Sequence, residues 1–423
     1  EGAPNTVRHH ICAPKLVWRA KLGDCILGGM ASGKEIRERD LEGFRYVKPM
    51  QKLLKHLHKA GTERDRAGNR KWHMDQHVAL LLLFMFNPIC DSLRSLQRAS
   101  QLKKVQRLLG VPRASLGSLS EANHVFDAQL LRGLIDQLVE QLEPLPHDRR
   151  LDDVGAILTL VDGTLLEALP KMAWALWTDS KHRGLKAHMH YELLTGVPVD
   201  ATITAGRASE KQVLRERLEA DRMYVLDRGY ASHQLLWEIT AAKSSFVCRL
   251  KDNAKLVVHE ERQLTPEAQQ AGVERDMLVD VGRGATRQRM RAIRVRCRPY
   301  RKVCGRKTKY DRSGPCQGET LLVVTDRTDL PAEVIALIYH RRWQIEVFFR
   351  FFKHVLGCRH LLSHQQNGIQ LQIYVAIIAC LLIALWTGKK PNKATCEMVA
   401  WYLAGVATQE ELDAHIKALK TQA

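Results

Sequence analysis

Cysteine pairs at metal-binding spacing are missing from this chain. It holds ten cysteines in 423 residues, yet none forms a CxxC pair, and their spacings resemble neither a zinc ribbon nor a disulfide framework. We therefore expect thiols that stay reduced in a cytoplasm. Two groups leave a metal site open as the less favoured alternative: Cys297, Cys304 and Cys316, and His9, His10 and Cys12.

Long hydrophobic runs are missing as well. The N-terminus has neither the apolar segment of a signal peptide nor an initiator methionine, so we expect a processed or truncated start. The most apolar run, Ile373–Trp386, is shorter than the ~20 residues that cross a bilayer. We predict that it forms a buried core helix, as does Val78–Phe86, and that the chain does not span a membrane.

Acidic residues are scarce relative to basic ones. Lys and Arg number 65 and Asp and Glu 46, which gives a net charge of +19. This excess favours nucleic acid or an anionic membrane surface as the partner, and a merely basic soluble protein is the alternative. The clustering of the basic residues argues against a merely basic soluble protein. The length suits one to three domains with a large core.

Residues 1–148 are predicted to be helical, because apolar residues recur there at helical spacing. The segment Ser118–Glu121 resembles a capping box that would begin a helix over Val125–Leu142. Residues 92–122 have the pattern of a helix–turn–helix that breaks at Gly110, and an ordinary helical bundle is the alternative. We expect this region to bind DNA ends, and we expect a helical tail over residues 389–423.

From about residue 149 the apolar residues follow strand spacing instead. We predict strands at Ile157–Asp162, Lys186–Leu194, Val197–Ala205, Met223–Leu226 and Ser245–Leu250, with helices at Ser209–Ala220 and His233–Lys243. This is the order of an α/β, ribonuclease-H-like sheet, in which the first and fourth strands are neighbours. Asp162 ends the first strand and Asp227 follows the fourth, so we expect these acids to meet.

Residues 252 to about 320 interrupt this pattern with a basic segment. Between Arg283 and Lys309 there are 12 Lys or Arg and no acid. Arginines alternate in two groups whose change of phase fits a bulge or a change of face: Arg287, Arg289 and Arg291, then Arg294, Arg296 and Arg298. We predict a β-rich insertion that grips phosphates, with a solvated basic surface as the alternative. The sheet is expected to resume at Leu321–Thr325.

The stretch from residue 339 to 353 carries four polar residues among apolar and aromatic ones: Tyr339, Arg342, Glu346 and Lys353. In a single helix at about 100° per residue, all four fall within about 60° of arc. The other directions hold side chains that can pack into a core. A carboxylate beside a phenol and two cations suits a group that binds a metal ion next to a polyanion.

Three acids are candidates for a shared metal site: Asp162, Asp227 and Glu346. Phosphodiester cleavage by two Mg²⁺ ions requires several carboxylates that hold the ions about 3.5–4 Å apart. Carboxylate and water oxygens are the ligands that Mg²⁺ prefers. Each acid taken alone could be an ordinary surface residue, but two that follow apolar strands and a third on an aromatic helix favour a common site.

The spacing Tyr-x2-Arg-x3-Glu-x6-Lys resembles the full signature of a large group of bacterial insertion-sequence transposases, the insertion-sequence-four family. LVDGT at 160–164 and VLDRGY at 225–230 are similar to that family's two aspartate motifs. FVCRLK at 246–251 and LLVVTD at 321–326 are similar to its flanking strands, and NPICDSLRSLQRAS at 87–100 to the helical start of some members. The resemblance spans about residues 45 to 388.

This resemblance implies a ribonuclease-H-like domain over residues 149–388, with a β-rich insertion and an Asp-Asp-Glu triad. Asp162, Asp227 and Glu346 would be the ligands of two Mg²⁺ ions, for which Mn²⁺ is expected to substitute. Transposon-end DNA would be contacted by Tyr339, Arg342 and Lys353. Further candidates for DNA contact are Arg228, Tyr230 and Trp343, the last of which could stack on a base or pack in the core.

The implied activity is cut-and-paste DNA transposition. Cleavage at the terminal inverted repeats would free a 3′-hydroxyl, which would attack target DNA, with a hairpin on the donor duplex as one route. No covalent protein–DNA intermediate is needed, so Tyr339 is predicted to be a contact and not a nucleophile. Two protomers are expected in a synaptic complex, in the bacterial cytoplasm at the nucleoid.

Two other functions stay open from the residues alone. One is a domesticated, non-catalytic DNA-binding protein with the same fold, against which the intact acids argue. The other is glycoside hydrolysis by paired carboxylates, a chemistry that does not call for a basic stripe.

Two smaller patterns are given ordinary roles. His188 and His190 share a strand face and are expected to be core or surface residues and not metal ligands, although Lys186 and His188 could approach DNA beside Asp162. Trp174 and Trp177 are expected to pack in the core.

Overall fold

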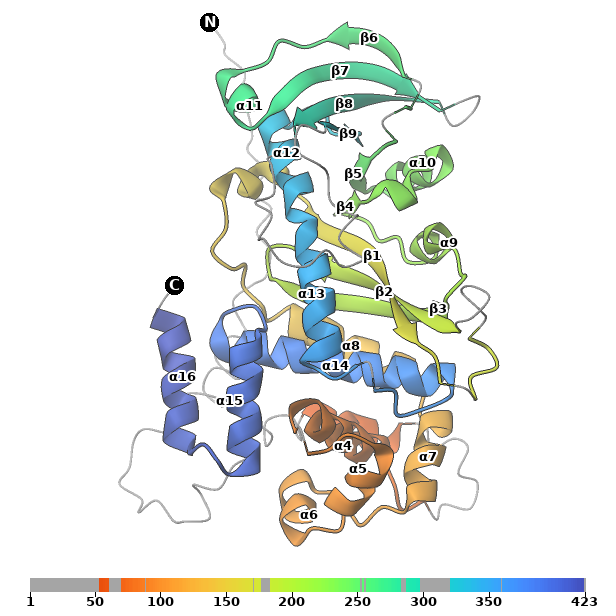
Figure 1. Cartoon of the computed structure of the whole chain (residues 1–423), viewed down its shortest axis with the longest axis vertical. Coiled ribbons are helices and arrows are strands. Elements are labelled where there is room, and N and C mark those ends of the chain that lie inside the picture. Colours follow the sequence, from red (N-terminus) through yellow and green to blue (C-terminus); the bar gives the residue numbers. More distant parts are fainter. Residues whose placement is uncertain are drawn as a thin grey trace, which may run out of the picture.

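A nine-stranded mixed sheet forms the centre of this α/β chain. The computed structural model describes residues 53–60 and 70–421, apart from residues 88, 170, 176–182, 252, 255, 283–286, 297–319 and 359. The strand order is β3-β2-β1-β4-β5-β9-β8-β7-β6 (Figure 1). The α/β class predicted from the sequence is confirmed. The two cysteine-containing groups considered as metal sites, and Trp177, lie outside the described residues.

The first part of the sheet has the strand order that the sequence predicted. β1 pairs antiparallel with β2 and parallel with β4, β3 follows β2 in a hairpin, and β5 runs parallel to β4. The bounds are β1 (Ile157–Glu167), β2 (Gly184–Glu192), β3 (Val197–Ala205), β4 (Arg222–Leu226) and β5 (Ser245–Arg249).

One boundary in this part was predicted wrongly. β1 does not end at Asp162, because residues 163–167 continue to pair with β2. The apolar run that suggested a short strand marks only the segment that is buried on both faces, and the remainder of β1 alternates between buried and exposed residues. Asp162 is therefore held inside a strand and not at its end.

The basic segment extends the same sheet. It contributes β6, β7 and β8, which continue from β9. The bounds are β6 (Val257–Glu261), α11 (Pro266–Gln270), β7 (Val273–Val281), β8 (Gln288–Arg296) and β9 (Thr320–Thr325). β8 pairs with β9 without a register shift from Arg291 to Arg296, so the phase change of the arginines is a change of face and not a bulge.

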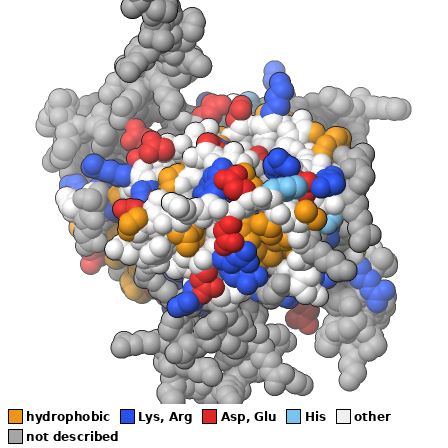
Figure 2. All heavy atoms as spheres, turned by 90° about the horizontal axis from the view of Figure 1, so that it is seen from above, with side chains coloured by type: hydrophobic (Ala, Val, Ile, Leu, Met, Phe, Trp, Pro, Cys, Tyr) orange, Lys and Arg blue, Asp and Glu red, His pale blue; other side chains and the backbone are white. Residues whose placement is uncertain are grey.

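Acidic residues on β7 neutralise several of these arginines. The guanidinium of Arg291 is buried 2.7 Å from the Asp276 carboxylate, and Arg287 and Arg289 lie 2.6 and 3.3 Å from Asp280. Figure 2 views this end of the molecule from above and shows basic and acidic side chains next to one another. The alternating arginines therefore do not form a uniformly basic face.

Helices cover both faces of the sheet (Figure 1). α9 and α10 pack on an apolar cluster that contains Val161 and Leu226, while α12, α13 and α14 pack on a second cluster that contains Leu160 and Val225. Successive strand residues point to opposite faces, which is how β1 serves both clusters. The bounds are α9 (Glu210–Arg215), α10 (His233–Ala241), α12 (Ala332–Arg341), α13 (Trp343–His354) and α14 (Gln366–Thr387).

α14 is a core helix. It has 22 residues and is long and apolar enough to cross a membrane, but 94% of its most apolar window is buried within the protein. It packs against β3, α4 and α8. The apolar run noted in the sequence is its central part, and the polar ends of the helix make it longer than predicted.

Short helices occupy the described residues before β1 and those after α14. The break at Gly110 has a left-handed backbone, φ 63°, which ends α6. The predicted capping box is wrong: α7 begins after Ser115, whose hydroxyl accepts a hydrogen bond from the Ser118 N–H at 2.9 Å. The bounds are η1 (Lys55–Lys59), α4 (Met74–Phe86), α5 (Leu93–Ala99), α6 (Lys103–Leu109), α7 (Leu116–Val125), η3 (Ala128–Leu131), α8 (Arg132–Val139), η4 (Arg149–Val154), α15 (Lys393–Ala404) and α16 (Gln409–Thr421).

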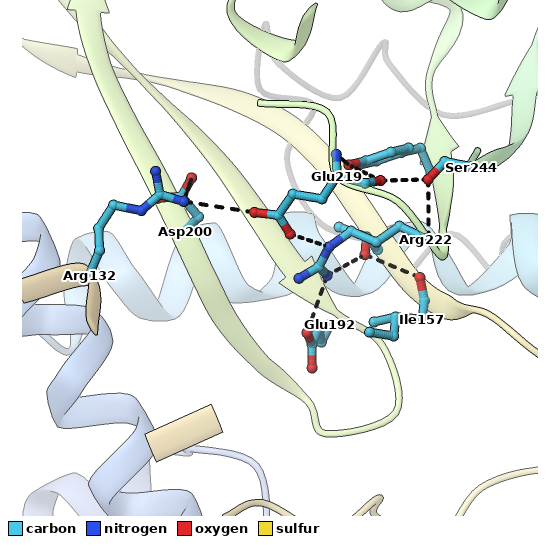
Figure 3. A network of polar contacts seen from close by, with 9 residues as sticks. Arg132, Ile157, Glu192, Asp200, Glu219, Arg222 and Ser244 are labelled. Atoms are coloured by element: carbon cyan, nitrogen blue, oxygen red, sulfur yellow. Dashed lines mark hydrogen bonds and ion pairs between the residues drawn. The ribbon is translucent and has the colours of Figure 1, made fainter. Parts of the chain in front are cut away.

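A network of ion pairs lies at the end of the sheet where β1 and β4 begin (Figure 3). Arg222 donates to Glu219 at 2.6 Å and to Glu192 at 3.2 Å. Arg132 of α8 lies 3.6 Å from Asp200 and 3.8 Å from Glu219. Each of these three carboxylates lies within 4 Å of one of the two guanidiniums, so none of them is without an ion-pair partner.

Candidate active site

Asp162 and Asp227 lie next to each other at the end of the parallel pair β1–β4. The last residues paired in that ladder are Val161 and Leu226, and each acid directly follows one of them. β4 ends there, so Asp227 leaves the sheet and precedes the 3₁₀ turn η5 (Arg228–Tyr230). The strand register therefore brings together two acids that are far apart in the sequence.

Glu346 is supplied by α13, and here the prediction of one continuous helix is wrong. The helix divides at Arg342 into α12 and α13. The cause is local: the Arg342 N–H donates to the Tyr339 carbonyl at 3.0 Å, and the Ile345 N–H donates to the Arg342 carbonyl at 3.2 Å. These i to i+3 hydrogen bonds tighten the turn, while Arg342 keeps a helical backbone.

The break does not separate the polar residues from the acids. The Tyr339 hydroxyl donates to Asp227 Oδ1 at 3.3 Å. The Arg342 guanidinium lies 3.5 Å from Asp162 Oδ2 and donates to Glu346 Oε1 at 2.6 Å. Asp162, Asp227 and Glu346 are thus connected through two side chains of the predicted stripe.

The surroundings of Asp162 disfavour the charged form of its carboxyl group. Burial raises the pKa of its carboxyl to about 6, although Arg342 and the Gly163 N–H favour the charged form, and Glu210 and Asp227 raise the pKa further. Burial opposes the charge of Arg342 as well, yet Tyr339, Asp227 and Glu346 outweigh it and hold the pKa of Arg342 above its usual range. The site thus holds more negative charge than one guanidinium relieves.

The carboxylates do not enclose a common point as they stand. Among the residues that the structure describes, no group of three or more His, Cys, Asp or Glu side chains is arranged to hold a metal ion. The contacts explain this, because the Arg342 guanidinium contacts both Asp162 and Glu346. Carboxylate oxygens suit a hard divalent ion as ligands, but here the positive charge between Asp162 and Glu346 is the Arg342 guanidinium.

The other predicted site residues have different surroundings. Arg228 is exposed directly after Asp227, and Trp343 is 48% exposed at the start of α13. Lys353 is half-buried in the last turn of α13, and burial lowers its pKa. Tyr230 is only 1% exposed, so a direct contact between its side chain and a DNA phosphate does not fit this structure.

Glu210 is a residue of this site that the sequence reasoning missed. It is the first residue of α9, and its Oε1 lies 3.0 Å from Lys186 Nζ on β2. It reaches the site from the α9 side of the sheet and raises the pKa of Asp162. A glutamate that begins a charged helix is usually at the surface. The available signal was a glycine close after each aspartate: Gly163 directly follows Asp162, and Gly229 is two residues after Asp227.

The histidines and Trp174 have the ordinary roles that were predicted. His188 and His190 are buried, and the Nε2 atom of His188 lies 2.8 Å from Thr204 Oγ1. Burial lowers the pKa of His188 to about 4. The indole N–H of Trp174 donates to the His364 carbonyl at 2.8 Å, and its ring packs against the core.

The family model and the curated relatives that match this chain are all of transposases. Residues 155–382 match the family described as "Transposase DDE domain". A Sinorhizobium fredii protein named as transposase y4zB is 28% identical over 231 residues, which cover 54% of this chain and 61% of that protein. A Geobacillus stearothermophilus protein named as the transposase of insertion sequence element IS5377 is 26% identical over 290 residues, 68% of this chain and 71% of that protein. A piggyBac transposase in a synaptic complex with hairpin DNA matches 91% of this chain and 86% of its own, with a TM-score of 0.42 and 9% identity.

Proposed function

The chain belongs to the family of DDE transposases, enzymes that cleave and transfer DNA strands, and we propose that Asp162, Asp227 and Glu346 form its catalytic triad. One observation carries the proposal. The β1–β4 register makes Asp162 and Asp227 neighbours, and Arg342 contacts both Asp162 and Glu346. Three acids from distant parts of the sequence thereby lie together where the pairing of the central strands β1 and β4 stops.

The fold supports a ribonuclease-H-like assignment for residues 149–388. The strand order β3-β2-β1-β4-β5, with β2 antiparallel to its neighbours and β1, β4 and β5 parallel, is the one expected for that core. Strands β6 to β8 stand where the inserted β-rich segment is expected, between Asp227 and Glu346.

Divalent-metal dependence is a general property of the family, and here we propose two Mg²⁺ ions, with Mn²⁺ as a substitute. When bound, the metal ions activate the attacking oxygen and stabilise the leaving oxygen. The carboxylate donors of the triad fit such ions, and the pKa of Asp162 is raised first by burial and then by its acidic neighbours Glu210 and Asp227, so an added positive charge there would be favourable. For these acids to bind the ions, Arg342 must release Glu346.

DNA contact is proposed for Arg342, Lys353, Arg228 and Trp343. Arg342 and Lys353 are cations on the α12–α13 side of the acids, and Arg228 is exposed beside Asp227. An arginine freed from Glu346 could bind a phosphate with both ends of its guanidinium. Tyr339 is proposed to support Asp227 and to lie beside the DNA, because its hydroxyl already donates to that carboxylate.

We also propose a DNA substrate and an oligomeric assembly for this enzyme. The DNA would be the terminal inverted repeats of the element and its target, joined in a synaptic homodimer at the bacterial nucleoid. The helical N-terminal region, residues 1–148, would bind the repeat ends, and residues 389–423 would form a helical tail. A hairpin at the donor end remains part of the proposed route.

Cleavage of end-containing DNA tests the triad. Purified protein with Mg²⁺ is expected to cut terminal repeats taken from the DNA that flanks the gene. Asp162→Asn, Asp227→Asn and Glu346→Gln should each lower the rate by about 10³-fold or more, because each removes a metal ligand at the reacting phosphate. Asp153→Asn, an exposed aspartate that lies outside the site, is the matched control. Full cutting by any triad variant contradicts the assignment.

The role of Tyr339 is tested with the same assay. Tyr339→Phe removes one hydrogen bond to Asp227 but no ligand, so cleavage should fall by no more than about 10-fold. A Tyr339→Phe protein that binds DNA but has lost all cleavage would show that the phenol takes part in the chemistry.

A further inference from the structure

Tyr230 has a buried hydroxyl without a hydrogen-bond partner. The residue is 1% exposed, and its Oη atom is among the few buried side-chain atoms in the described residues that lack a partner. Burial raises the pKa of Tyr230 well above its usual range, with further contributions from the negative charges of Glu210, Asp162 and Asp227. An unsatisfied hydroxyl in the core costs free energy, so a hydroxyl kept among three carboxylates points to a partner that binds there.

Glu210 stands between the two segments that carry the aspartates. A Cβ atom built on Gly163 would lie 2.8 Å from Glu210 Oε1, and one built on Gly229 would lie 3.6 Å from Glu210 Oε2. The two carboxylate oxygens therefore face the backbone next to Asp162 on one side and next to Asp227 on the other. A side chain at residue 163 would therefore require the end of the Glu210 side chain to move.

Glu210 also keeps charge that its partner does not fully balance. Its one described ion pair is with Lys186 at 3.0 Å, which engages Oε1, while Oε2 faces the backbone at Gly229. It approaches from α9, whereas Glu346 approaches from α13 on the other face of the sheet. The two aspartates thus lie between acids that come from opposite faces.

We propose that Glu210 and Tyr230 are positioning residues that form an outer layer of the metal site, and this rests on the proposed triad. Mg²⁺ retains several of its waters in proteins, and those waters require hydrogen-bond acceptors. Glu210 would accept hydrogen bonds from these metal-bound waters. The Tyr230 hydroxyl would donate a hydrogen bond to the carboxylates that hold the metal. Neither residue replaces a member of the triad.

Metal affinity separates this role from a structural one. Mn²⁺ binding to the full chain is measured by titration calorimetry, and stability without metal by thermal unfolding. Tyr230→Phe and Glu210→Gln should each weaken Mn²⁺ binding about 10-fold, as the loss of outer-layer partners does in other metal sites. Tyr230→Phe should leave the metal-free melting temperature unchanged or raise it, because the variant loses only an unpaired hydroxyl.

Two matched variants serve as controls. Tyr374→Phe removes a buried hydroxyl that does have a partner, Asp200 at 3.2 Å, and should lower stability without changing Mn²⁺ affinity. Glu216→Gln makes the same charge change as Glu210→Gln on the exposed side of the same segment and should change neither quantity.

The outcomes distinguish this inference from the proposed function. If Asp162→Asn loses Mn²⁺ while Tyr230→Phe and Glu210→Gln bind it within twofold of wild type, the outer layer is wrong and the triad stands. If wild type binds no Mn²⁺, or Asp162→Asn binds it unchanged, the metal site itself is wrong and the outer layer falls with it.

A double-mutant cycle tests the contact at Gly163. Gly163→Ala should weaken Mn²⁺ binding by displacing Glu210, and its effect should be smaller in a Glu210→Ala background, where only the Lys186 side chain, 3.1 Å from the new Cβ atom, remains close. Equal effects of Gly163→Ala in both backgrounds would overturn the proposed position of Glu210 in the site.

Discussion

The two ends of the β1–β4 pair carry charge clusters of the same residue types and opposite character. Where the strands begin, Arg222 and Arg132 face Glu192, Glu219 and Asp200 in closed ion pairs (Figure 3). Where the parallel pairing stops, the proposed triad and Glu210 gather around Arg342 and Lys186, and burial raises the pKa of Asp162 to about 6.

The difference shows which cluster serves stability. A buried ion pair offsets the cost of its own desolvation only when each charge has a partner, and at the beginning of the strands every carboxylate of the network contacts a guanidinium. The other cluster gathers four carboxylates around Arg342 and Lys186, and it contains a tyrosine hydroxyl without a partner. Such perturbed groups collect at functional sites, where a ligand supplies what the protein alone lacks.

The largest stability effect should separate the two ends. Arg222→Met leaves the nearly buried Glu192 without its cation and should lower the free energy of unfolding by about 3–5 kcal/mol. Arg150→Met breaks an exposed pair with Asp148 and should change the free energy of unfolding far less, because solvent screens that pair. Denaturant unfolding measures both. Equal losses of unfolding free energy in the two variants would show that the Arg222 network does not stabilise the fold more than an exposed ion pair does.

Divalent metal should act on one end only. At Mg²⁺ about 100-fold above its dissociation constant, wild type should gain about 2.7 kcal/mol in the free energy of unfolding. Asp162→Asn should lose most of this gain, because it removes a ligand, and Arg222→Met should keep it. Thermal unfolding with and without Mg²⁺ provides the measurement. A gain that survives in Asp162→Asn but disappears in Arg222→Met would reverse the comparison.

The smallest effect concerns DNA binding beside the acidic cluster around Arg342. Lys353→Ala should weaken binding to all sequences and reduce the slope of log K against log salt by about 1, because one phosphate contact is lost. Lys393→Ala is the control, since Lys393 is 72% exposed on α15 and pairs with Glu397 at 3.3 Å. Binding titrations over a range of salt measure the slope, and an unchanged slope for Lys353→Ala would exclude its phosphate contact.

Much of this arrangement could be predicted from the sequence, because it depends on local patterns. Short apolar runs placed Asp162 and Asp227 at neighbouring strands, and the spacing from Tyr339 to Glu346 placed three polar side chains on one side of a helix. What escaped prediction depends on contacts between distant segments. Asp280 on β7 neutralises arginines of β8, and Glu210 enters the site across the sheet from α9.

Two local details of the helices could not be predicted from residue spacing either. The turn at Arg342 tightens through i to i+3 hydrogen bonds, which residue spacing alone does not reveal. Ser115 and Ser118 are three residues apart and both suit a helix start, so only the backbone decides that Ser115 is the cap.

The position of a bound metal ion tests the central claim most directly. In crystals of the chain grown with Mn²⁺, anomalous scattering should place manganese within ligand distance of carboxylate oxygens from Asp162, Asp227 and Glu346, with the Arg342 guanidinium moved away from Glu346. Manganese at any other group of side chains, or a Glu346 that keeps its pair with Arg342 while the ion is bound elsewhere, would contradict the account.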